Sequence, residues 1–248
     1  MKHVHENISA VIIASGFSKR AGGLNPLLTF GGFSFLVGIA LKLSVFCKDI
    51  VVVFGNEEAK ITKSFNEEIN NMLTHSELSA VAKLLQSKLR FVTNKNYEAG
   101  MFSSLQNGVK DLSSSVDWIF YHFVDQPHLS LKFYSEFLQQ LDSSYDWIQP
   151  AFNNAKGHPI IFNKTVANSV LAADMNSNLR SVLRERKFST KIWNTSNAQV
   201  SFDVDTAEDY RLLLNSFAQN ITEKELLAFQ FDNLESTLKS HIVINPTF

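Results

Sequence analysis

The chain has 248 residues, of which 45% are hydrophobic and 12% aromatic, and its 23 Lys and Arg nearly balance its 24 Asp and Glu. This length and composition suffice for one large α/β domain or two small ones. Because no basic block interleaves with aromatic residues, we expect no nucleic-acid partner.

The single cysteine, Cys47, excludes an internal disulfide and favours a reducing compartment. It lies in an apolar stretch, where an inert buried thiol is expected rather than a nucleophile. The N-terminal residues lack an apolar core for export, and no apolar run approaches the roughly 20 residues of a membrane span. We therefore expect a cytoplasmic protein without a membrane partner.

The first predicted element is a β-branched strand over residues 9–14, followed directly by a loop rich in Gly and Ser. Consecutive backbone N–H groups of such a loop can approach an anion, and Lys19 and Arg20 would neutralise it. The spacing fits neither G-x-x-x-x-G-K-[ST] nor G-x-G-x-x-G. The segment indicates a phosphate site, and the alternative is an ordinary turn after a strand.

Further strands are predicted at residues 50–54, 89–93, 118–123 and 147–150, where β-branched or aromatic runs recur. Apolar residues at three- and four-residue steps predict helices over residues 35–46, 57–73 and 131–141. This alternation is typical of a doubly wound, largely parallel sheet. If the strands are parallel, the loops after Ala14, Thr93 and Val124 share the edge where ligands bind in such folds.

The second half of the chain is less regular. Residues 159–162 and 198–202 are predicted as extra strands, running antiparallel at one side, and a helix with an acidic first turn is predicted to begin near Thr206. A further amphipathic helix is predicted after about Asn215, where Thr222 and Glu225 form a capping box. We expect a domain over residues 1–215 and a helical extension over residues 216–248 that packs on it or on a second subunit.

Acidic residues follow two of the predicted strands. Asp125 comes after the apolar run 118–123, where a carboxylate suits Mg²⁺, and the alternative is a cap for the turn that Pro127 imposes. Asp203 and Asp205 share one face of an extended strand, so one can reach the metal while the other caps the next helix. We expect the loop to hold the outer phosphates of a ligand and the carboxylates to hold the bridging ion.

Two other motifs contain residue types that often take part in catalysis or binding. His158 in K-G-H-P is either a turn histidine bonded to the backbone or a substrate contact. Ser103 and Ser104 lack a G-x-S-x-G setting, so they do not indicate a serine hydrolase.

Together these segments resemble the MobA-like NTP transferases, and most closely their molybdenum cofactor cytidylyltransferase branch. Residues 13–22, I-A-S-G-F-S-K-R-A-G, are similar to the family's L-A-A-G-x-S-x-R-M-G loop, and Asp125-Gln126-Pro127 is similar to its metal motif. The segments G-M-F-S-S-L at 100–105, G-H-P at 157–159 and D-V-D-T-A-E-D at 203–209 are similar to its base-binding, acceptor and closing elements. The five matches follow the family's order over residues 8–214.

The resemblance implies a Rossmann-like three-layer α/β/α nucleotidyltransferase fold with a mostly parallel central sheet. It implies transfer of a nucleoside monophosphate, with CMP favoured, from an NTP to the phosphate of a molybdopterin-type cofactor, with release of pyrophosphate. The implied cofactor is Mg²⁺, and the implied partners are CTP, a phosphorylated pterin and, beyond them, a molybdoenzyme.

The resemblance also assigns residues to roles. Those implied to bind the nucleotide are Ala14, Ser15, Gly16, Phe17, Ser18, Gly100, Ser103 and Ser104. Those implied in catalysis are Lys19, Arg20, Asn25 and Asp125. The implied metal ligands are Asp125 and Asp205, and the implied border of the acceptor pocket is Gly157, His158 and Pro159.

The chain departs from the family at Asn25, which stands where the family has a lysine. A neutral amide cannot stabilise charge as an ammonium does, and losing one such partner typically costs on the order of 100-fold in rate. One alternative function is therefore a catalytically weak nucleotide- or molybdopterin-binding accessory or carrier protein for a molybdoenzyme. Another is a sugar-phosphate nucleotidyltransferase on the same fold.

Overall fold

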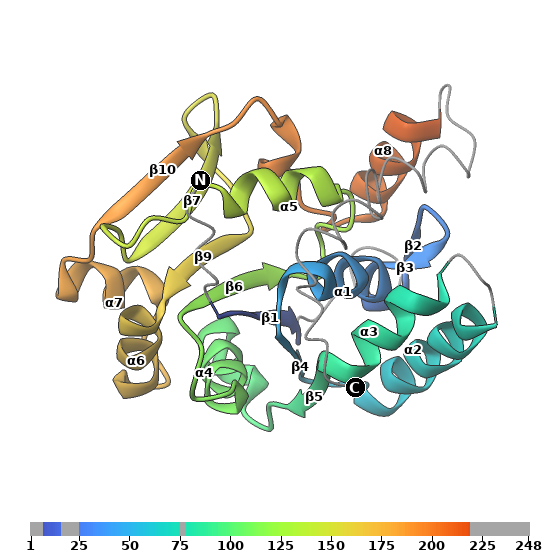
Figure 1. Ribbon diagram of the computed structural model, residues 1–248, viewed down its shortest axis with the longest axis horizontal. Coiled ribbons are helices and arrows are strands. Elements are labelled where there is room, and N and C mark those ends of the chain that lie inside the picture. The colour runs from blue at the N-terminus through green and yellow to red at the C-terminus, as the bar shows by residue number, and fades with distance from the viewer. Residues whose placement is uncertain (1–6, 16–24, 75–77, 219–248) are drawn as a thin grey trace, which may run out of the picture.

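A central sheet organises the computed structural model, which describes residues 7–15, 25–74 and 78–218 (Figure 1). Its path is β10-β7-β9-β6-β1-β4-β5, with β8 paired to β7, and a separate hairpin is formed by β2 and β3. The strands are β1 (Ile8–Ala14), β2 (Thr29–Phe30), β3 (Phe33–Ser34), β4 (Asp49–Phe54), β5 (Leu89–Thr93), β6 (Trp118–Phe123), β7 (Trp147–Phe152), β8 (Ala155–Lys156), β9 (Ile160–Asn163) and β10 (Thr190–Asn194).

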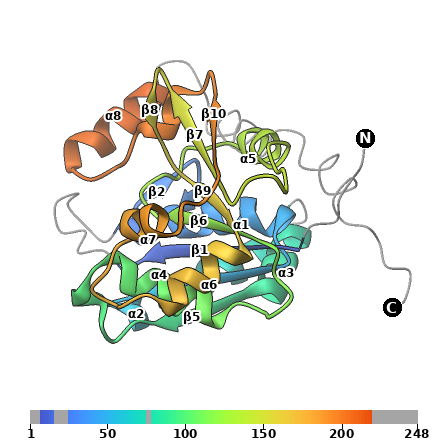
Figure 2. The same ribbon diagram turned by 90° about the vertical axis from the view of Figure 1, so that its left-hand side faces the viewer.

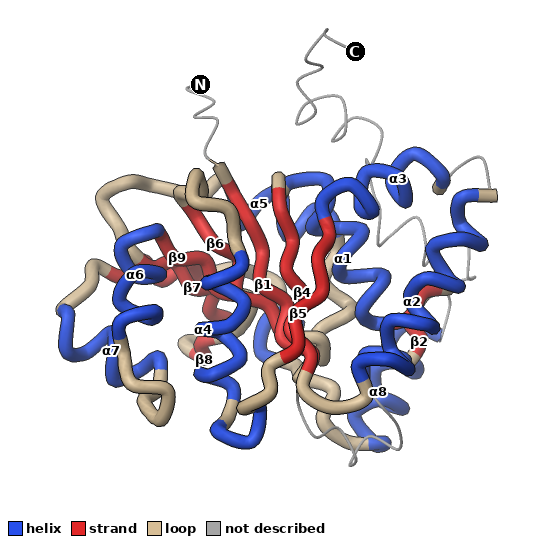
Figure 3. The backbone as a smooth tube through the Cα atoms, turned by 90° about the horizontal axis from the view of Figure 1, so that it is seen from below, coloured by secondary structure: helices blue, strands red, loops and turns tan. Residues whose placement is uncertain are grey.

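Most neighbouring strands of the sheet path are parallel. β1 pairs parallel with β4 and β6, β4 with β5, and β10 with β7, whereas β9 is antiparallel to both β6 and β7. Figure 3 shows β6, β1, β4 and β5 side by side. The predicted parallel sheet and the antiparallel strand near residues 159–162 are therefore confirmed, and the loops after β1, β5 and β6 leave from one edge.

Helices cover both faces of the sheet, as the alternation of buried residues along β1 requires (Figure 2). Ala10 and Ile12 belong to the buried cluster that includes residues of α1 (Phe35–Phe46), α2 (Glu58–Leu73), α3 (Ser79–Lys88), α5 (Leu131–Leu138) and α8 (Ala207–Ala218). Val11 and Ile13 belong to the cluster that includes residues of α4 (Met101–Asp111), α6 (Lys164–Ala172) and α7 (Leu179–Arg186). This is the three-layer α/β/α arrangement that the resemblance implied.

Close contact between α4 and the sheet depends on Gly108. A Cβ added there would lie 2.4 Å from Val11 Cγ1 and 2.9 Å from Val53 Cγ2, and valine side chains have little rotamer freedom. The glycine therefore lets α4 lie against β1 and β4, which brings its N-terminus to the carboxyl edge of the sheet.

The strand predicted over residues 198–202 was wrong. The chain forms a 3-10 helix there, η4 (Ala198–Ser201), because the Asn197 side chain accepts the N–H of Gln199 at 3.0 Å and tightens the turn. Val200 is the one buried residue of η4, so this segment has no alternating buried face to place in a sheet.

The helix predicted near Thr206 is confirmed as α8. Thr206 Oγ1 accepts the N–H of Asp209 at 3.1 Å, and Asp209 Oδ2 accepts the N–H of Thr206 at 2.8 Å, which is the reciprocal arrangement of a capping box. α8 continues to Ala218, and the helix expected after Thr222 lies outside the described residues.

Cys47 is completely buried, and burial raises the pKa of its thiol, in agreement with the inert core role expected of it. None of the helices over residues 7–15, 25–74 and 78–218 combines the length and apolarity needed to cross a bilayer.

Candidate functional site

The expected phosphate loop has two described ends, while Gly16, Phe17, Ser18, Lys19 and Arg20 lie outside the described residues. Ser15, just after Ala14 at the end of β1, has its hydroxyl 2.8 Å from Ser104 Oγ on α4. Asn25 begins the 3-10 helix η2 (Asn25–Leu27), and its Nδ2 donates to Val204 O at 2.9 Å. The loop therefore starts against the expected base-binding segment and ends against the acidic segment near residue 204.

A buried polar network supports the start of α4. Asn94 Nδ2, just after β5, donates to Ser103 Oγ at 2.8 Å and Ser104 Oγ at 3.0 Å, and Ser103 Oγ donates to Gly100 O at 2.8 Å. Gly100 has φ 102°, a conformation that favours glycine. Because both serines are buried within this network, they fix the shape of the Gly100 turn. Asn94 was not predicted, and its place directly after a strand at the ligand edge was the available signal.

Three carboxylates gather at the end of β6. The N–H of Val204 donates to Asp125 O at 3.0 Å, which places Asp203 and Asp205 on either side of this contact. Burial raises the pKa of Asp125 to about 7, with smaller contributions in the same direction from Asp203 and Asp205. Burial also raises the pKa of Asp203, against the opposing effect of a 2.8 Å hydrogen bond from Gln126 Nε2.

The helix cap expected from Asp203 or Asp205 is supplied by other residues. Thr206 and Asp209 cap α8, and Asp209 Oδ2 also accepts the N–H of Asp205 at 3.2 Å. Asp203 is instead bonded to Gln126, because the turn after β6 brings that amide within reach. The Asp205 residue is exposed at this edge, with its backbone held by Asp209.

The donor set fits a hard divalent cation. Asp125 Oδ1 is buried without a hydrogen-bond partner in the described part of the chain, and so are Asn25 Oδ1 and Gln126 Oε1. Such unpaired oxygens suit Mg²⁺ or a similar ion, which takes one or two carboxylates and completes its shell with substrate phosphates. The described residues hold no group of three or more His, Cys, Asp or Glu that could bind a metal alone.

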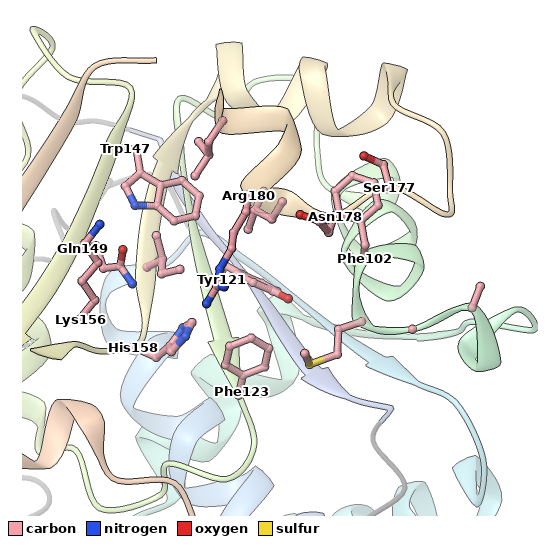
Figure 4. A pocket seen from close by; sticks show the side chains of 16 residues that line it. Phe102, Tyr121, Phe123, Trp147, Gln149, Lys156, His158, Ser177, Asn178 and Arg180 are labelled. Atoms are coloured by element: carbon pink, nitrogen blue, oxygen red, sulfur yellow. The ribbon is translucent and has the colours of Figure 1, made fainter. Parts of the chain in front are cut away.

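A cavity of about 860 Å³ opens beside this edge, between β6, β7 and the starts of α4 and α7 (Figure 4). Its wall carries connected rings: Tyr121 meets Phe123 edge to face at 4.8 Å, and Phe123 meets His158 at 4.7 Å. Trp147 adds a large ring that stacks on Phe162 behind it at 5.9 Å. Gly100 also lines the cavity, so the expected nucleotide and acceptor segments adjoin.

Two cations stand at the rim of the cavity. Lys156 comes from β8 and Arg180 from α7, and Figure 4 shows the Arg180 side chain reaching toward Tyr121 and His158. Among the described residues, no carboxylate lies within ion-pair distance of either cation. Trp147 and Arg180 were missed in the sequence, because they reach the cavity from elements far from any recognised motif.

The Gly157-His158-Pro159 segment fixes one side of the cavity. A Cβ added to Gly157 would lie 2.1 Å from Val200 O, so only glycine fits there without movement of the backbone. The N–H of His158 donates to the same carbonyl at 2.8 Å. Burial lowers the pKa of His158 to about 4, so its ring is neutral near pH 7 and lies at the cavity wall.

Comparison with known protein families finds a match. Residues 10–191 match the MobA-like NTP transferase domain. A 4-diphosphocytidyl-2C-methyl-D-erythritol synthase from Anaerococcus prevotii superposes with TM-score 0.64 at 16% identity, covering 87% of this chain and 97% of the synthase. A Mycobacterium tuberculosis protein in complex with manganese gives TM-score 0.61 at 16% identity, covering 85% and 99% of the two chains.

A molybdopterin-guanine dinucleotide biosynthesis protein A from Archaeoglobus fulgidus gives TM-score 0.55 at 11% identity, covering 84% of this chain and 97% of that protein. At these identities the structural likeness shows the fold. No curated protein matches the sequence significantly. The family match spans most of the chain, including the strand before the loop, the Asp125 turn and the Gly157 segment. The chain therefore belongs to the MobA-like NTP transferase family and is a nucleotidyltransferase.

Proposed function

We propose that this nucleotidyltransferase moves a nucleoside monophosphate, CMP by preference, from an NTP to the phosphate of a molybdopterin-type cofactor, with Mg²⁺ as the ion and pyrophosphate as the leaving group. The observation that carries the proposal is the ring-lined cavity with Lys156 and Arg180 at its rim. A flat heteroaromatic acceptor can stack on such rings, and its phosphate can pair with the cations. The buried thiol of Cys47 suits work in a reducing cytoplasm.

In this proposal the two substrates meet at Gly100. The turns at Ser15 and Gly100 hold the nucleotide, while the phosphate loop, with Lys19 and Arg20, holds its outer phosphates. Asp125 and Asp205 bind the ion, which when bound neutralises phosphate charge. The rate enhancement then comes from alignment of the acceptor oxygen with the α-phosphorus, without a covalent enzyme intermediate.

Thermal unfolding with each nucleoside triphosphate tests the nucleotide half of this function. We expect CTP with Mg²⁺ to stabilise the protein most, because a ligand at 100 times its dissociation constant adds about 2.7 kcal/mol to the free energy of unfolding. The measurement is the shift of the unfolding midpoint with and without Mg²⁺. If no triphosphate shifts the midpoint, the protein is not acting on nucleotides.

Asn25 separates an active transferase from the alternative of a weak accessory or carrier protein. The Asn25 side-chain amide donates to Val204 O, and only 4% of Asn25 is exposed. Asn25 therefore already has a structural role. We expect Asn25→Lys and the control Asn25→Ala both to release pyrophosphate at or below the rate of the parent, since both disturb this contact. A more than tenfold gain with lysine would favour the weak-relative alternative.

Cation binding should depend on pH through Asp125. Its raised pKa, about 7, means that protonation of this carboxyl stabilises the ion-free fold at low pH and that this contribution is lost as the pH rises through 7. The ion binds the ionised form, so Mn²⁺ affinity should rise about tenfold between pH 6 and 8. Calorimetric titration checks this, and Asp125→Asn should bind weakly with little pH dependence. An affinity that is flat from pH 6 to 8 in the parent would contradict the assignment.

Arg180 tests the acceptor half. Arg180→Gln removes a charge-assisted contact of about 1.5–3 kcal/mol, so the KM for a phosphorylated pterin should rise about 10- to 100-fold while the KM for CTP is unchanged. Arg184→Gln on the same helix is the matched control, because Arg184 does not line the cavity. Equal KM values in the two variants would move the acceptor elsewhere. Preference for a sugar phosphate over the pterin would favour the sugar-phosphate transferase alternative.

A further inference from the structure

Lys42 has a fully buried amine in the middle of α1. Its exposed fraction is 0%, and its Nζ donates to Pro127 O at 2.7 Å. Burial lowers the pKa of Lys42 to about 7. The neighbouring Leu41 and Leu43 are also 0% exposed, so the surroundings of this helix accept aliphatic side chains. Helix packing alone therefore does not explain a polar group at position 42, because an amine there loses its hydration.

The hydrogen-bond acceptor of the amine, Pro127 O, explains a lysine at this position. Pro127 closes the turn that begins with Asp125, and its carbonyl accepts from Lys42 on α1. A buried carbonyl needs a donor, and the Lys42 side chain is long enough to bring one from the helix. Lys42 thus reaches the backbone two residues after the proposed ion ligand.

The remaining anchors of this turn come from one segment, residues 199–204. Gln126 Nε2 donates to Asp203 Oδ1 and to Val200 O, and the His128 ring is 3.1 Å from Gln199 O. The N–H of Val204 donates to Asp125 O. Lys42 holds the turn from α1, so the turn is fixed between a helix of the core and the acidic segment.

Two buried histidines, His122 and His128, lie close enough to Lys42 to feel its charge. Burial, with a smaller contribution in the same direction from the charge of Lys42, lowers the pKa of His122 to about 3 and that of His128 to about 4. Both rings are therefore neutral near pH 7. The His122 ring is held between Phe123 O at 2.6 Å and Tyr134 Oη at 2.7 Å, so both of its ring nitrogens already have partners.

We propose that Lys42 is a positioning residue for the cation site, which fixes the Asp125-Gln126-Pro127 turn so that the Asp125 carboxylate faces Asp205. The identity of the ion rests on the proposed function, whereas the role of Lys42 rests on its contact with Pro127. Loss of an outer partner that orients a metal ligand typically lowers metal affinity about 10- to 100-fold. We expect a loss of that size when the amine is removed.

The test measures Mn²⁺ binding to the full chain with CTP by calorimetry, without turnover. Lys42→Met keeps an unbranched side chain, one heavy atom shorter, and removes the donor, and Leu41→Met is the matched control on the same helix. We expect Mn²⁺ affinity to fall about 10- to 100-fold in Lys42→Met and to stay at the parent value in Leu41→Met. Thermal unfolding without metal measures the structural effect of each variant separately.

Parent-level Mn²⁺ affinity in a folded Lys42→Met protein would overturn the proposal and leave Lys42 as a core group alone. If Lys42→Met does not fold, Lys42→Gln decides: its donor is one bond shorter, so the turn must move to meet it, and affinity should fall several-fold. Parent-level affinity in that variant would also overturn the proposal. A parent protein that binds no Mn²⁺ at all would instead contradict the proposed function, so the two failures are distinguishable.

Discussion

The backbone N–H and carbonyl of Val204 connect the parts of the chain that form the candidate site. Its N–H donates to Asp125 O at 3.0 Å, its carbonyl accepts from Asn25 Nδ2 at 2.9 Å, and its side chain is completely buried. A buried residue needs partners for both its backbone N–H and its carbonyl, and here the partners come from segments about 80 and 180 residues away. Folding therefore cannot bury Val204 without bringing the end of the phosphate loop, the turn after β6 and the acidic segment to one place.

That same contact concentrates negative charge. Asp203 and Asp205 flank Val204, and their charges add to burial in raising the pKa of Asp125. A buried carboxylate oxygen without a partner, such as Asp125 Oδ1, lowers the stability of the fold. Groups perturbed in this way cluster at functional sites. Ion binding would relieve the repulsion that the Val204 contact creates. In the proposed function, stability and ion binding thus place opposing demands on Asp125. Hydrogen bonds that involve Gln126, Val204 and Asp209 hold the segment in place against the repulsion.

Local sequence predicted the elements whose own residues determine them. α1 was predicted at its observed bounds, since its apolar run begins after Ser34, whose hydroxyl accepts the N–H of Val37. β5 and β6 were likewise predicted at their bounds because their aromatic and β-branched residues end at polar turns. The hydrophobic residues of η4 suggested a strand, and the Asn197 side chain prevented it. Lys42, Asn94 and Arg180 could not be assigned from the sequence, because each acquires its role from a partner or cavity formed by distant segments.

In the sequence resemblance, Asn25 stands where the family has a lysine, and in the structure its side chain is bonded to the backbone of Val204. A lysine there would bring a positive charge to the phosphates, whereas the asparagine donates to Val204 O and so helps to hold Val204 beside Asp125. Charge stabilisation in an enzyme depends on how firmly dipoles and ions are fixed before the reaction as well as on how many charges are present. In the proposed function, the positive charge at the triphosphate would come from Lys19, Arg20 and the ion, so the placement of the ion would matter more. The buried contacts of Asn25 and Lys42 act on the same requirement from two sides, since one fixes the acidic segment and the other fixes the turn that carries Asp125.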